Sequence, residues 1–351
     1  MTEALVTQPI GLLERLAAGP VICAEGYLFE IERRGFLQAG AFVPEVVLEY
    51  PEMVAALHRE FVHAGSDVVE AFTYYAHREK LRIIGKEHLL EAMNKAALTI
   101  ARDVARETGS LFAGDICNTN IFVGDDESRR AVRAMFEEQV GWAVDAGVDC
   151  IIGETFSWGE EAAIALEAIK GAGVPAVMTL AIHQQPETRE GWTPEEACQR
   201  LEAAGADVVG LNCIRGPRTM LPLLAAIRER VSCYVAALPV PYRTTADQPS
   251  FQSLRDPAYP NAPGGRPFPT ALDPFTCNRY EIGDFAKDAY EIGVRYLGVC
   301  CGAGPHHIRG MAEALGKTPP GSRFSADMSK HAFLGTDASL RAQNQEYAKE
   351  L

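Results

Sequence analysis

The sequence predicts an α/β fold, a (β/α)8 TIM barrel with a long proline-rich insertion and a C-terminal extension. Two observations lead to this prediction. A helix that ends at a glycine is followed by an apolar run in four places, HAGSDVVEAF (63–72), DAGVDCIIGETF (145–156), AAGADVVGLNC (203–213) and EIGVRYLGVCC (291–301). Such unbroken runs are typical of parallel strands covered by helices on both faces, and eight of them can be found along the chain. A doubly wound open sheet is the alternative.

The elements follow one another in a regular order. We expect strands at 21–27, 67–74, 111–117, 148–154, 175–182, 207–213, 233–239 and 296–301. Helical periodicity lies between them, for example over 51–65, 127–147 and 193–205. Pro51 and Pro194 stand near helix starts, where proline is tolerated, and Thr193 is a suitable N-cap. The glycine that ends each repeated helix suits a C′ position, which often requires positive φ.

Two segments depart from this rhythm. Residues 241–277 carry eight prolines and separate the seventh strand from its helix, and a connection of this length is usually a functional loop or a disordered one. Residues 316–351 are polar and charged after a short linker. We therefore expect a catalytic barrel over 1–315 and an extension over 316–351, which is either a frayed terminus or an arm that packs on a neighbouring subunit.

Charge and hydropathy exclude several classes of partner. The formal net charge of −14 argues against a nucleic-acid or anionic-membrane surface. No apolar stretch approaches the roughly 18 residues needed to cross a bilayer, and the N-terminus has no pattern of a signal peptide. Nine scattered cysteines, an odd number, indicate a reducing compartment. We therefore expect a cytoplasmic protein whose partners are small molecules, with no nucleic acid and no membrane.

Polar residues gather at the carboxyl ends of the predicted strands, which meet on the face where barrel enzymes build their active sites. They are Glu25, Thr73, Tyr74, Tyr75, Asp115, Glu154, His183, Asn212, Cys213, Cys300 and Cys301. Three of them are cysteines, from the sixth and eighth strands. A single buried cysteine is usually a small hydrophobe, whereas three at one rim indicate a zinc site with an open fourth position. Because three thiolates make the zinc complex anionic, the site suits holding and activating another thiol.

Aromatic and acidic residues surround the same rim. Phe42, Tyr74, Tyr75, Phe156 and Trp158 could form a cage for a quaternary ammonium group, although aromatic residues at a barrel mouth often only pack against one another. The carboxylates of Glu25, Asp115 and Glu154 could bind a substrate ammonium, or could pair with groups of the protein itself.

Two motifs carry a resemblance to a known family. GLNCI at 210–214 and GVCCGAGPHHIRGMAEAL at 298–315 resemble the zinc signatures of the homocysteine S-methyltransferase family. LHREFVHAGSDVVEAFTYYAHREKL (57–81), YEIGVRYLG (290–298) and FEIERRGFLQAG (29–40) resemble its betaine–homocysteine branch. The resemblance extends over residues 10–315 and, more weakly, over the tail.

The resemblance implies a zinc-dependent barrel that transfers a methyl group from an onium donor to homocysteine and forms methionine. Cys213, Cys300 and Cys301 match the zinc ligands, with Asn212 before the first. Glu154 matches the acid for the homocysteine amino group, and Tyr75 a tyrosine of the donor site. The branch is oligomeric through its C-terminal extension, so we expect a homo-oligomer here.

The sequence also departs from the branch at both substrates. Its Asp-Gly-Gly is Ala24-Glu25-Gly26, its threonine near the acceptor is Ala71, and its donor-site tryptophan is Phe42. A tyrosine is replaced by Thr155, and Asp115 brings an acid where the branch has a small or apolar residue. We assign catalytic roles to Glu154, Glu25, Tyr75 and Asn212, and substrate contacts to Gly26, Phe42, Thr73, Tyr74, Asp115, Phe156 and Trp158.

The residues leave open the methyl donor, the thiol acceptor and whether the protein transfers a methyl group at all. The donor is a betaine, such as glycine betaine or proline betaine, or a sulfonium such as S-methylmethionine or dimethylsulfoniopropionate. The acceptor is homocysteine or another thiol. A further alternative is that the protein binds or senses zinc through its thiolates and transfers no methyl group.

Overall fold

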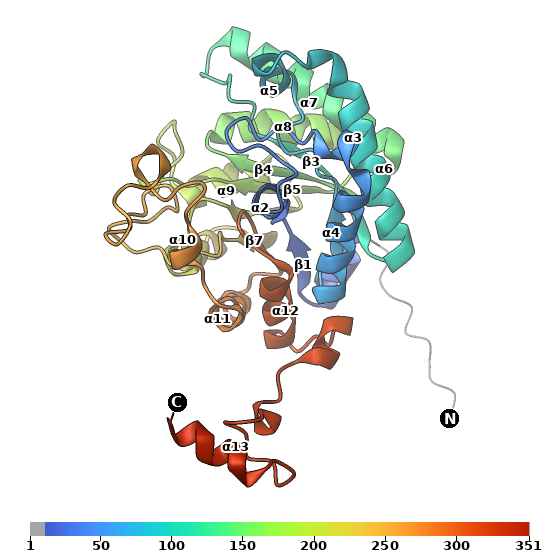
Figure 1. Ribbon diagram of the computed structural model, residues 1–351. Helices are drawn as coiled ribbons and strands as arrows, with labels where there is room; N and C mark the ends of the chain where they lie inside the picture. The colour runs from blue at the N-terminus through green and yellow to red at the C-terminus, as the bar shows by residue number, and fades with distance from the viewer. Residues whose placement is uncertain (1–10, 351) are drawn as a thin grey trace.

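The computed structural model describes residues 11–350, and its central feature is a closed barrel of eight parallel strands (Figure 1). Each strand pairs with the next in the chain, and β1 pairs with β8, so the open-sheet alternative is excluded. The strands are β1 Val21–Ala24, β2 Val68–Glu70, β3 Leu111–Cys117, β4 Cys150–Phe156, β5 Ala176–Leu180, β6 Val208–Asn212, β7 Tyr234–Leu238 and β8 Tyr296–Val299. All eight lie within or next to the predicted ranges.

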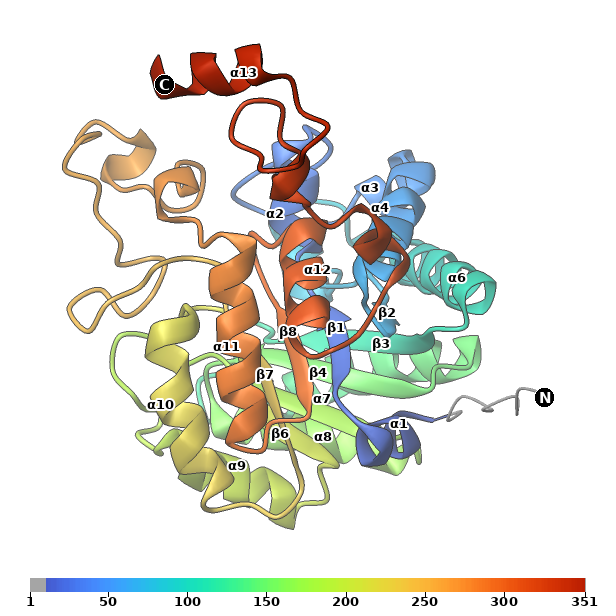
Figure 2. The same cartoon turned by 90° about the horizontal axis from the view of Figure 1, so that it is seen from below.

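Helices surround the barrel (Figures 1 and 2). The α-helices are α1 Leu12–Ala18, α2 Tyr27–Arg33, α3 Val46–Glu49, α4 Pro51–Ala64, α5 Arg78–Ile83, α6 Leu90–Thr108, α7 Asp126–Ala146, α8 Gly159–Gly171, α9 Pro194–Ala203, α10 Pro217–Arg228, α11 Arg279–Glu291, α12 Pro305–Ala314 and α13 Ala342–Tyr347. Short 3-10 helices lie at η1 Glu87–Leu89, η2 Pro263–Gly265, η3 Asp273–Phe275, η4 Pro320–Phe324, η5 Met328–Lys330 and η6 Ala348–Glu350.

The local signals in the sequence operate as predicted. Pro51 and Pro194 are the first residues of α4 and α9, and the Thr193 hydroxyl accepts a hydrogen bond from the backbone N–H of Glu196 at 3.3 Å. The glycines that end the four repeated helices have φ between 82° and 120°, where other residues would be strained; they are Gly65, Gly147, Gly205 and Gly293.

The barrel interior is a separate apolar core to which all eight strands contribute. Its members include Cys23, Val68, Ala113, Ile152 and Val177, all buried. Because strand side chains alternate in direction, the residue two positions further along each strand also points inward, at the carboxyl end. Those residues are Glu25, Glu70, Asp115, Glu154 and Thr179. The apolar filling of the barrel therefore gives way to a polar layer at the end where the strands finish.

The two departures from the barrel rhythm are distinct in the structure. Part of the 241–277 connection packs inward, since Tyr242, Phe251, Leu254 and Leu272 are buried. Phe251 is tied to the end of β6 by a backbone hydrogen bond from its N–H to the Ile214 carbonyl at 2.8 Å. The extension beyond α12 leaves the barrel, and α13 lies apart from it in both views (Figures 1 and 2).

Within residues 11–350, no helix combines the length and apolar character that a membrane crossing requires. The prediction that the chain begins without a signal peptide concerns residues 1–10 in part, and these lie outside the described residues.

Candidate active site

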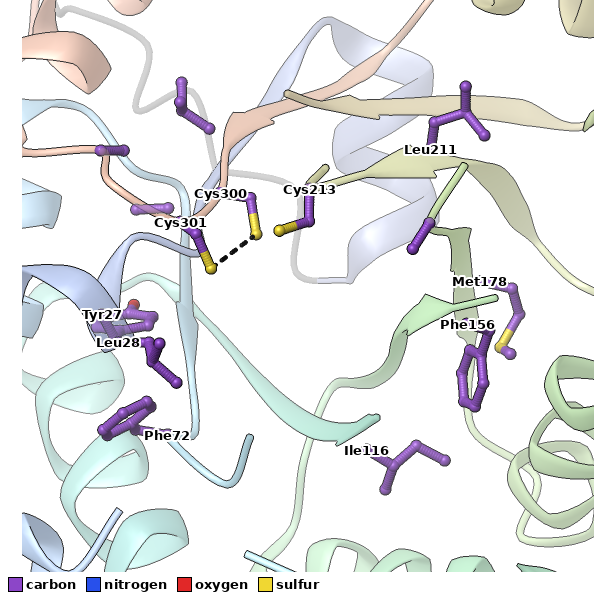
Figure 3. Close-up of a cluster of buried hydrophobic side chains, with 14 of the residues drawn as sticks. Tyr27, Leu28, Phe72, Ile116, Phe156, Met178, Leu211, Cys213, Cys300 and Cys301 are labelled. Carbon is purple, nitrogen blue, oxygen red and sulfur yellow. Dashed lines mark hydrogen bonds between the residues drawn. The ribbon is translucent and has the colours of Figure 1, made fainter. Parts of the chain in front are cut away.

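The three rim cysteines lie together. Cys213 follows the last residue of β6, and Cys300 and Cys301 follow the last residue of β8. Their sulfur atoms all lie within 4.8 Å of one another, and those of Cys300 and Cys301 are 3.9 Å apart (Figure 3). Tetrahedral zinc with bonds of about 2.3 Å to sulfur separates its ligand sulfurs by about 3.8 Å. The spacing and chemistry of these buried thiols therefore fit zinc.

Burial and mutual hydrogen bonding set the acidity of the cysteines. Hydrogen bonds from the thiols of Cys300 and Cys301 hold the pKa of Cys213 well below its usual range, and the same contact raises the pKa of Cys301. Burial raises the pKa of Cys300. All nine cysteines of the chain are free thiols, so none of these sulfurs is used in a disulfide.

Backbone strain is concentrated around this cluster. Six non-glycine residues in the described part of the chain have φ between 54° and 65°: Phe42, Tyr75, Asn120, Thr155, Cys213 and Ile214. All six line one cavity of about 190 Å³ beside the cysteines. Left-handed conformations cost free energy for side-chain-bearing residues and persist where function demands them. Their collection around a single cavity makes it the candidate functional site.

This first cavity has aromatic walls, and we refer to it as the aromatic cavity. Phe29, Phe42, Tyr74, Tyr75, Phe251 and Phe268 line it. The rings of Tyr74 and Tyr75 lie 4.2 Å apart, and those of Phe251 and Phe268 lie 4.8 Å apart. The ammonium of Lys80 sits 3.8 Å from the centre of the Tyr75 ring, a cation–π contact that already uses one face of Tyr75.

A second, much smaller cavity, the acidic cavity, lies beside the same cysteines and shares Leu28, Tyr74 and Cys301 with the aromatic cavity. Glu25, Glu70, Asp115 and Glu154 line it together with Cys300 and Cys301, and each of the four acids is at most 5% exposed. Burial raises the pKa of all four, that of Glu154 to about 8, and their mutual repulsion raises the pKa of Glu25, Glu70 and Asp115 further.

Asn212 organises the boundary between the two cavities. Its amide nitrogen donates to Glu154 at 2.5 Å, to the Thr155 hydroxyl at 2.9 Å and to Glu25 at 3.3 Å. Its amide oxygen accepts the backbone N–H of Thr155 at 2.9 Å. The residue directly before the first cysteine thus orients two carboxylates.

Three of the predicted substrate residues lie near the rim but line neither cavity, contrary to the prediction. The Thr73 hydroxyl donates to the Asp115 carbonyl at 2.7 Å, so it supports an acid of the acidic cavity. Gly26 allows a close approach: a Cβ there would lie 2.4 Å from the carbonyl oxygen of Ala303, two residues after Cys301. Trp158 directly precedes α8 without a capping hydrogen bond from its side chain, and its ring packs against Phe122 at 5.5 Å.

Phe156 is not part of the aromatic cavity, which corrects the prediction made from its position. Strand β4 contains an irregularity, because Gly153 pairs with Met178 while Phe156 pairs with Leu180. The left-handed Thr155 lies in this bulge and turns the next side chain outward. Phe156 is fully buried, packs against Phe136 of α7 and lies away from the cysteines (Figure 3).

Sequence reasoning missed several residues of the site. Glu70 was one of them, although it has the inward phase of Val68 and ends its strand. Arg189 and Gln252 line the aromatic cavity from long loops, where no periodic signal exists. His183, one of the residues predicted at the rim, lines this cavity as well and is hydrogen-bonded to Ser157 at 2.9 Å and to Gln252 at 3.3 Å.

Comparison with known proteins shows the family of the chain. The family model described as homocysteine S-methyltransferase matches residues 26–315. The chain belongs to the homocysteine S-methyltransferase family. The predicted family and the (β/α)8 barrel are thereby confirmed, and the protein is an S-methyltransferase.

Curated relatives in this family cover nearly the whole chain. Betaine–homocysteine S-methyltransferase 1 of Xenopus tropicalis is 36% identical over 95% of this chain and 83% of its own length. The S-methylmethionine–homocysteine S-methyltransferase of Rattus norvegicus is 35% identical over 95% of this chain and 88% of its own. The metallated homocysteine methyltransferase MmuM of Escherichia coli shares the fold, with a TM-score of 0.65 and 18% identity over 85% of this chain and 97% of that chain.

Proposed function

We propose that this protein is a zinc-dependent enzyme that transfers a methyl group from a betaine-type onium donor to the thiol of homocysteine and forms methionine. One observation carries the proposal: Cys301 lines both the acidic cavity and the aromatic cavity. A thiol held beside the three cysteines would face an acidic wall on one side and an aromatic wall on the other. Relatives named betaine–homocysteine S-methyltransferase support the same pair of substrates.

The transfer needs no acid catalyst. The acceptor thiol loses its proton to solvent, and the sulfur electron pair forms the new S–CH₃ bond. The donor nitrogen keeps the electron pair of the broken N–CH₃ bond and leaves as a neutral tertiary amine. Because no charge has to be neutralised on the leaving group, the protein contributes chiefly by bringing the two reactants into line.

Cys213, Cys300 and Cys301 would hold the zinc ion. When bound, zinc supplies the acceptor as a thiolate at neutral pH, where a free thiol with a pKa near 8.5 is mostly protonated. Glu154 and Glu25, oriented by Asn212, would hold the acceptor ammonium. Buried carboxylates without a protein cation suit this role because a substrate cation neutralises them.

The aromatic cavity would bind the donor. Its ring faces attract the positive methyl groups of an onium compound. Arg189 also lines this cavity, and its guanidinium makes no hydrogen bond or ion pair with any described residue. A guanidinium with free donors would bind the carboxylate of a betaine. Phe42 stands where the betaine–homocysteine branch has a tryptophan, and its smaller ring would leave room for a bulkier donor.

A sulfonium donor is the second candidate, favoured by the relative named S-methylmethionine–homocysteine S-methyltransferase. Glycine betaine, proline betaine and S-methylmethionine assayed separately with homocysteine distinguish the two. The highest kcat/KM with a betaine is the expected result.

We also infer the setting of the enzyme. Nine free thiols and a thiol-dependent metal site require a reducing compartment such as the cytoplasm. The 316–351 extension, with the barrel completed at residue 315, would serve as an oligomerisation arm.

The Cys301→Ala variant tests the proposal. It removes one of three expected ligands, so we expect less than one zinc per chain by elemental analysis. We further expect a loss of at least roughly 100-fold in kcat, since changes behind the ligands of a metal site already cost about 10- to 100-fold. Cys198→Ala, a buried cysteine of α9, is the matched control and should keep both zinc and activity. Full zinc and full activity in Cys301→Ala would refute the mechanism.

A further inference from the structure

The segment that follows β7 runs between the two loops that carry the cysteines. Strand β7 pairs with β6 on one side and with β8 on the other. The Leu238 carbonyl accepts the backbone N–H of Cys213 at 2.9 Å. The next carbonyl, that of Pro239, accepts the backbone N–H of Cys300 at 2.9 Å. These main-chain bonds fix where the two cysteine loops begin, and Tyr242, a few residues further along, contacts both loops beyond the cysteines.

Tyr242 is fully buried and touches a glycine in each cysteine loop. Its carbonyl lies against Gly216, three residues after Cys213, and its hydroxyl lies against Gly302, the residue after Cys301. A Cβ at either glycine would overlap these oxygen atoms, so both contacts are closer than a side chain would permit. Gly302 also has a φ of 96°, which favours glycine. The tyrosine therefore sets the separation of the loops that bring the three sulfurs together.

Arg33, the last residue of α2, ties the same hydroxyl to the same loop. One nitrogen of its guanidinium donates to the Tyr242 hydroxyl at 2.9 Å, and another donates to the Gly302 carbonyl at 3.1 Å. A guanidinium presents its donors in one rigid plane, so it holds the two acceptors at a fixed spacing. Because Gly302 follows Cys301 directly, this fork acts on the position of the Cys301 thiol.

The ring of Tyr242 faces the donor side of the site. It stacks on the ring of Phe251, with centres 6.1 Å apart and an angle of 24° between the planes. Phe251 lines the aromatic cavity together with Phe268. Tyr242 itself lines neither cavity, so it can act on the reactants only through its neighbours. Its hydroxyl and carbonyl contact the cysteine loops, and its ring supports the wall of the donor cavity.

We propose that Tyr242, held by Arg33, is a positioning residue that fixes the loop of Cys300 and Cys301 relative to the donor cavity. This inference rests on the proposed methyl transfer and adds to it an element that neither substrate would touch. In-line transfer requires the acceptor sulfur and the donor methyl to lie about 3–3.5 Å apart. The cysteines would hold the first and the aromatic cavity the second, and a misplacement of about 1 Å between them can cost roughly 100-fold in rate.

Two substitutions remove this link without changing the lining of either cavity. Tyr242→Phe deletes the hydroxyl and keeps the ring, and Arg33→Ala deletes the fork. We expect each to weaken zinc binding roughly 10-fold in competition with a chelator, and to lower kcat with glycine betaine and homocysteine by a similar factor, as changes behind metal ligands do. Arg33→Lys keeps the charge and one donor, so it should recover part of both losses.

The double variant Tyr242→Phe/Arg33→Ala shows whether the two residues act as one unit. Groups that work through a shared contact have effects that do not add. We expect the zinc affinity of the double variant to equal that of Arg33→Ala alone. Losses that add would show that the two side chains act separately, and would overturn the link.

Tyr242→Leu separates the two ends of the tyrosine. It removes the stack on Phe251 as well as the hydroxyl, so we expect KM for the donor to rise roughly 3- to 10-fold, the effect of losing an aromatic pair. In Tyr242→Phe the stack remains and KM for the donor should not change. A role confined to stability would lower the melting temperature in both variants without this split between kcat and KM.

Arg243→Ala and Tyr280→Phe are the matched controls. Arg243 is the next residue of the connection, and its guanidinium binds Glu281 of α11 at 2.7 and 2.6 Å. The Tyr280 hydroxyl accepts a hydrogen bond from Arg279 at 3.0 Å on the exposed surface of α11. Each control loses an arginine contact of the same kind and should keep the zinc affinity, kcat and KM of the wild type.

Unchanged zinc affinity and unchanged kcat in folded Tyr242→Phe and Arg33→Ala would overturn the inference. Absence of methyl transfer by the zinc-loaded wild type, with each betaine and with S-methylmethionine, would instead refute the proposed function. The chelator competition needs no turnover, so the two failures can be told apart.

Discussion

Asn212 shows how one neutral side chain can hold a strongly charged site in order. Its amide group donates to Glu154 and Glu25 and accepts from the backbone of Thr155. A cationic side chain in its place would neutralise the carboxylates and compete with a substrate ammonium. An amide orients the same carboxylates by hydrogen bonds and leaves their charge available. Position 212 therefore couples the shape of the acidic cavity to the adjacent Cys213.

Glu70 gives a pH-dependent prediction at the same scale. Burial raises its pKa well above the ordinary value, and the charges of Glu25, Glu154, Asp115 and Cys150 raise it further. In the unfolded chain Glu70 ionises near pH 4.3. The folded protein holds this proton more tightly, so the stability contributed by Glu70 falls as pH rises from about 4.3 toward its folded pKa.

Glutamine does not titrate, and its amide adds no charge to the cavity. We therefore expect the melting temperature of Glu70→Gln relative to wild type to increase between pH 5 and pH 8, by a few degrees. Thermal melts of the zinc-loaded protein without acceptor measure it. A difference that stays constant over this range, or that shrinks, would show that Glu70 is already ionised in the folded protein at pH 5.

Individual residues differ in how well the sequence reveals them. Cys213, Cys300 and Cys301 could be found because cysteine is chemically distinctive and two strand ends carry all three. Glu70 was missed because a single glutamate inside an apolar run gives no chemical signature of its own. Glu70 can be recognised as a site residue only because it points into the barrel, as Val68 does, and meets three acids from other strands. This convergence exists only in the closed barrel.

At the scale of elements, β4 illustrates the limit of reading a strand by its periodicity. Alternation over Cys150, Ile152 and Glu154 predicts that residue 156 also faces the barrel. The bulge at Thr155 reverses the phase, so Phe156 packs against α7. The same bulge brings Thr155 to the aromatic cavity and lets its hydroxyl donate to Glu154 at 2.9 Å. Gly153 lies at the start of this irregularity, but the left-handed residue itself is a threonine, which does not signal a bulge in the sequence.

The turn from β1 into α2 supports the loop that carries two of the cysteines. Ala303 lies against Gly26, where no side-chain atom intervenes. In Gly26→Ala the new Cβ would overlap the Ala303 carbonyl at 2.4 Å and displace the loop that begins at Cys300. We expect zinc affinity to fall at least about tenfold, as measured by competition with a chelator.

Gly141→Ala is the control for this change. Gly141 lies inside α7, and a Cβ there meets nothing within 4 Å. Alanine is the better helix former, so this variant should gain about 0.5–1 kcal/mol in the free energy of unfolding and bind zinc normally. Zinc affinity unchanged in Gly26→Ala would mean that the β8 loop tolerates the displacement, and that Gly26 has no part in holding the cysteines.

At the scale of the whole molecule, the barrel could be predicted because helix-ending glycines and apolar strands recur along the chain. The order of the strands around the barrel then follows from the chain order. The two cavities could not be predicted in the same way. The aromatic cavity combines Phe29 of α2 with Phe251 and Phe268 from the 241–277 connection, segments that no local pattern relates. Their association depends on how a proline-rich loop folds back over the strand ends.

The C-terminal extension carries the last prediction. Met328, Leu334 and Tyr347 are 58%, 62% and 53% exposed, although apolar side chains clustered on one short segment favour burial against a partner. Beyond η4 (Pro320–Phe324), the extension lies apart from the barrel in a single chain (Figure 1). We expect the full-length protein to be a homo-oligomer through this arm. A chain ending at residue 325 should then have a lower molar mass by light scattering, with its zinc content unchanged.

The point variant Leu334→Asp in the full-length chain separates loss of the interface from loss of the segment. It places a charge on an exposed apolar position and removes no hydrogen bond, so it should also lower the molar mass while the barrel melts at the same temperature. Oligomers of unchanged mass in both proteins would assign the assembly to the barrel surface. In that case the extension would be the frayed terminus that the sequence leaves as the alternative.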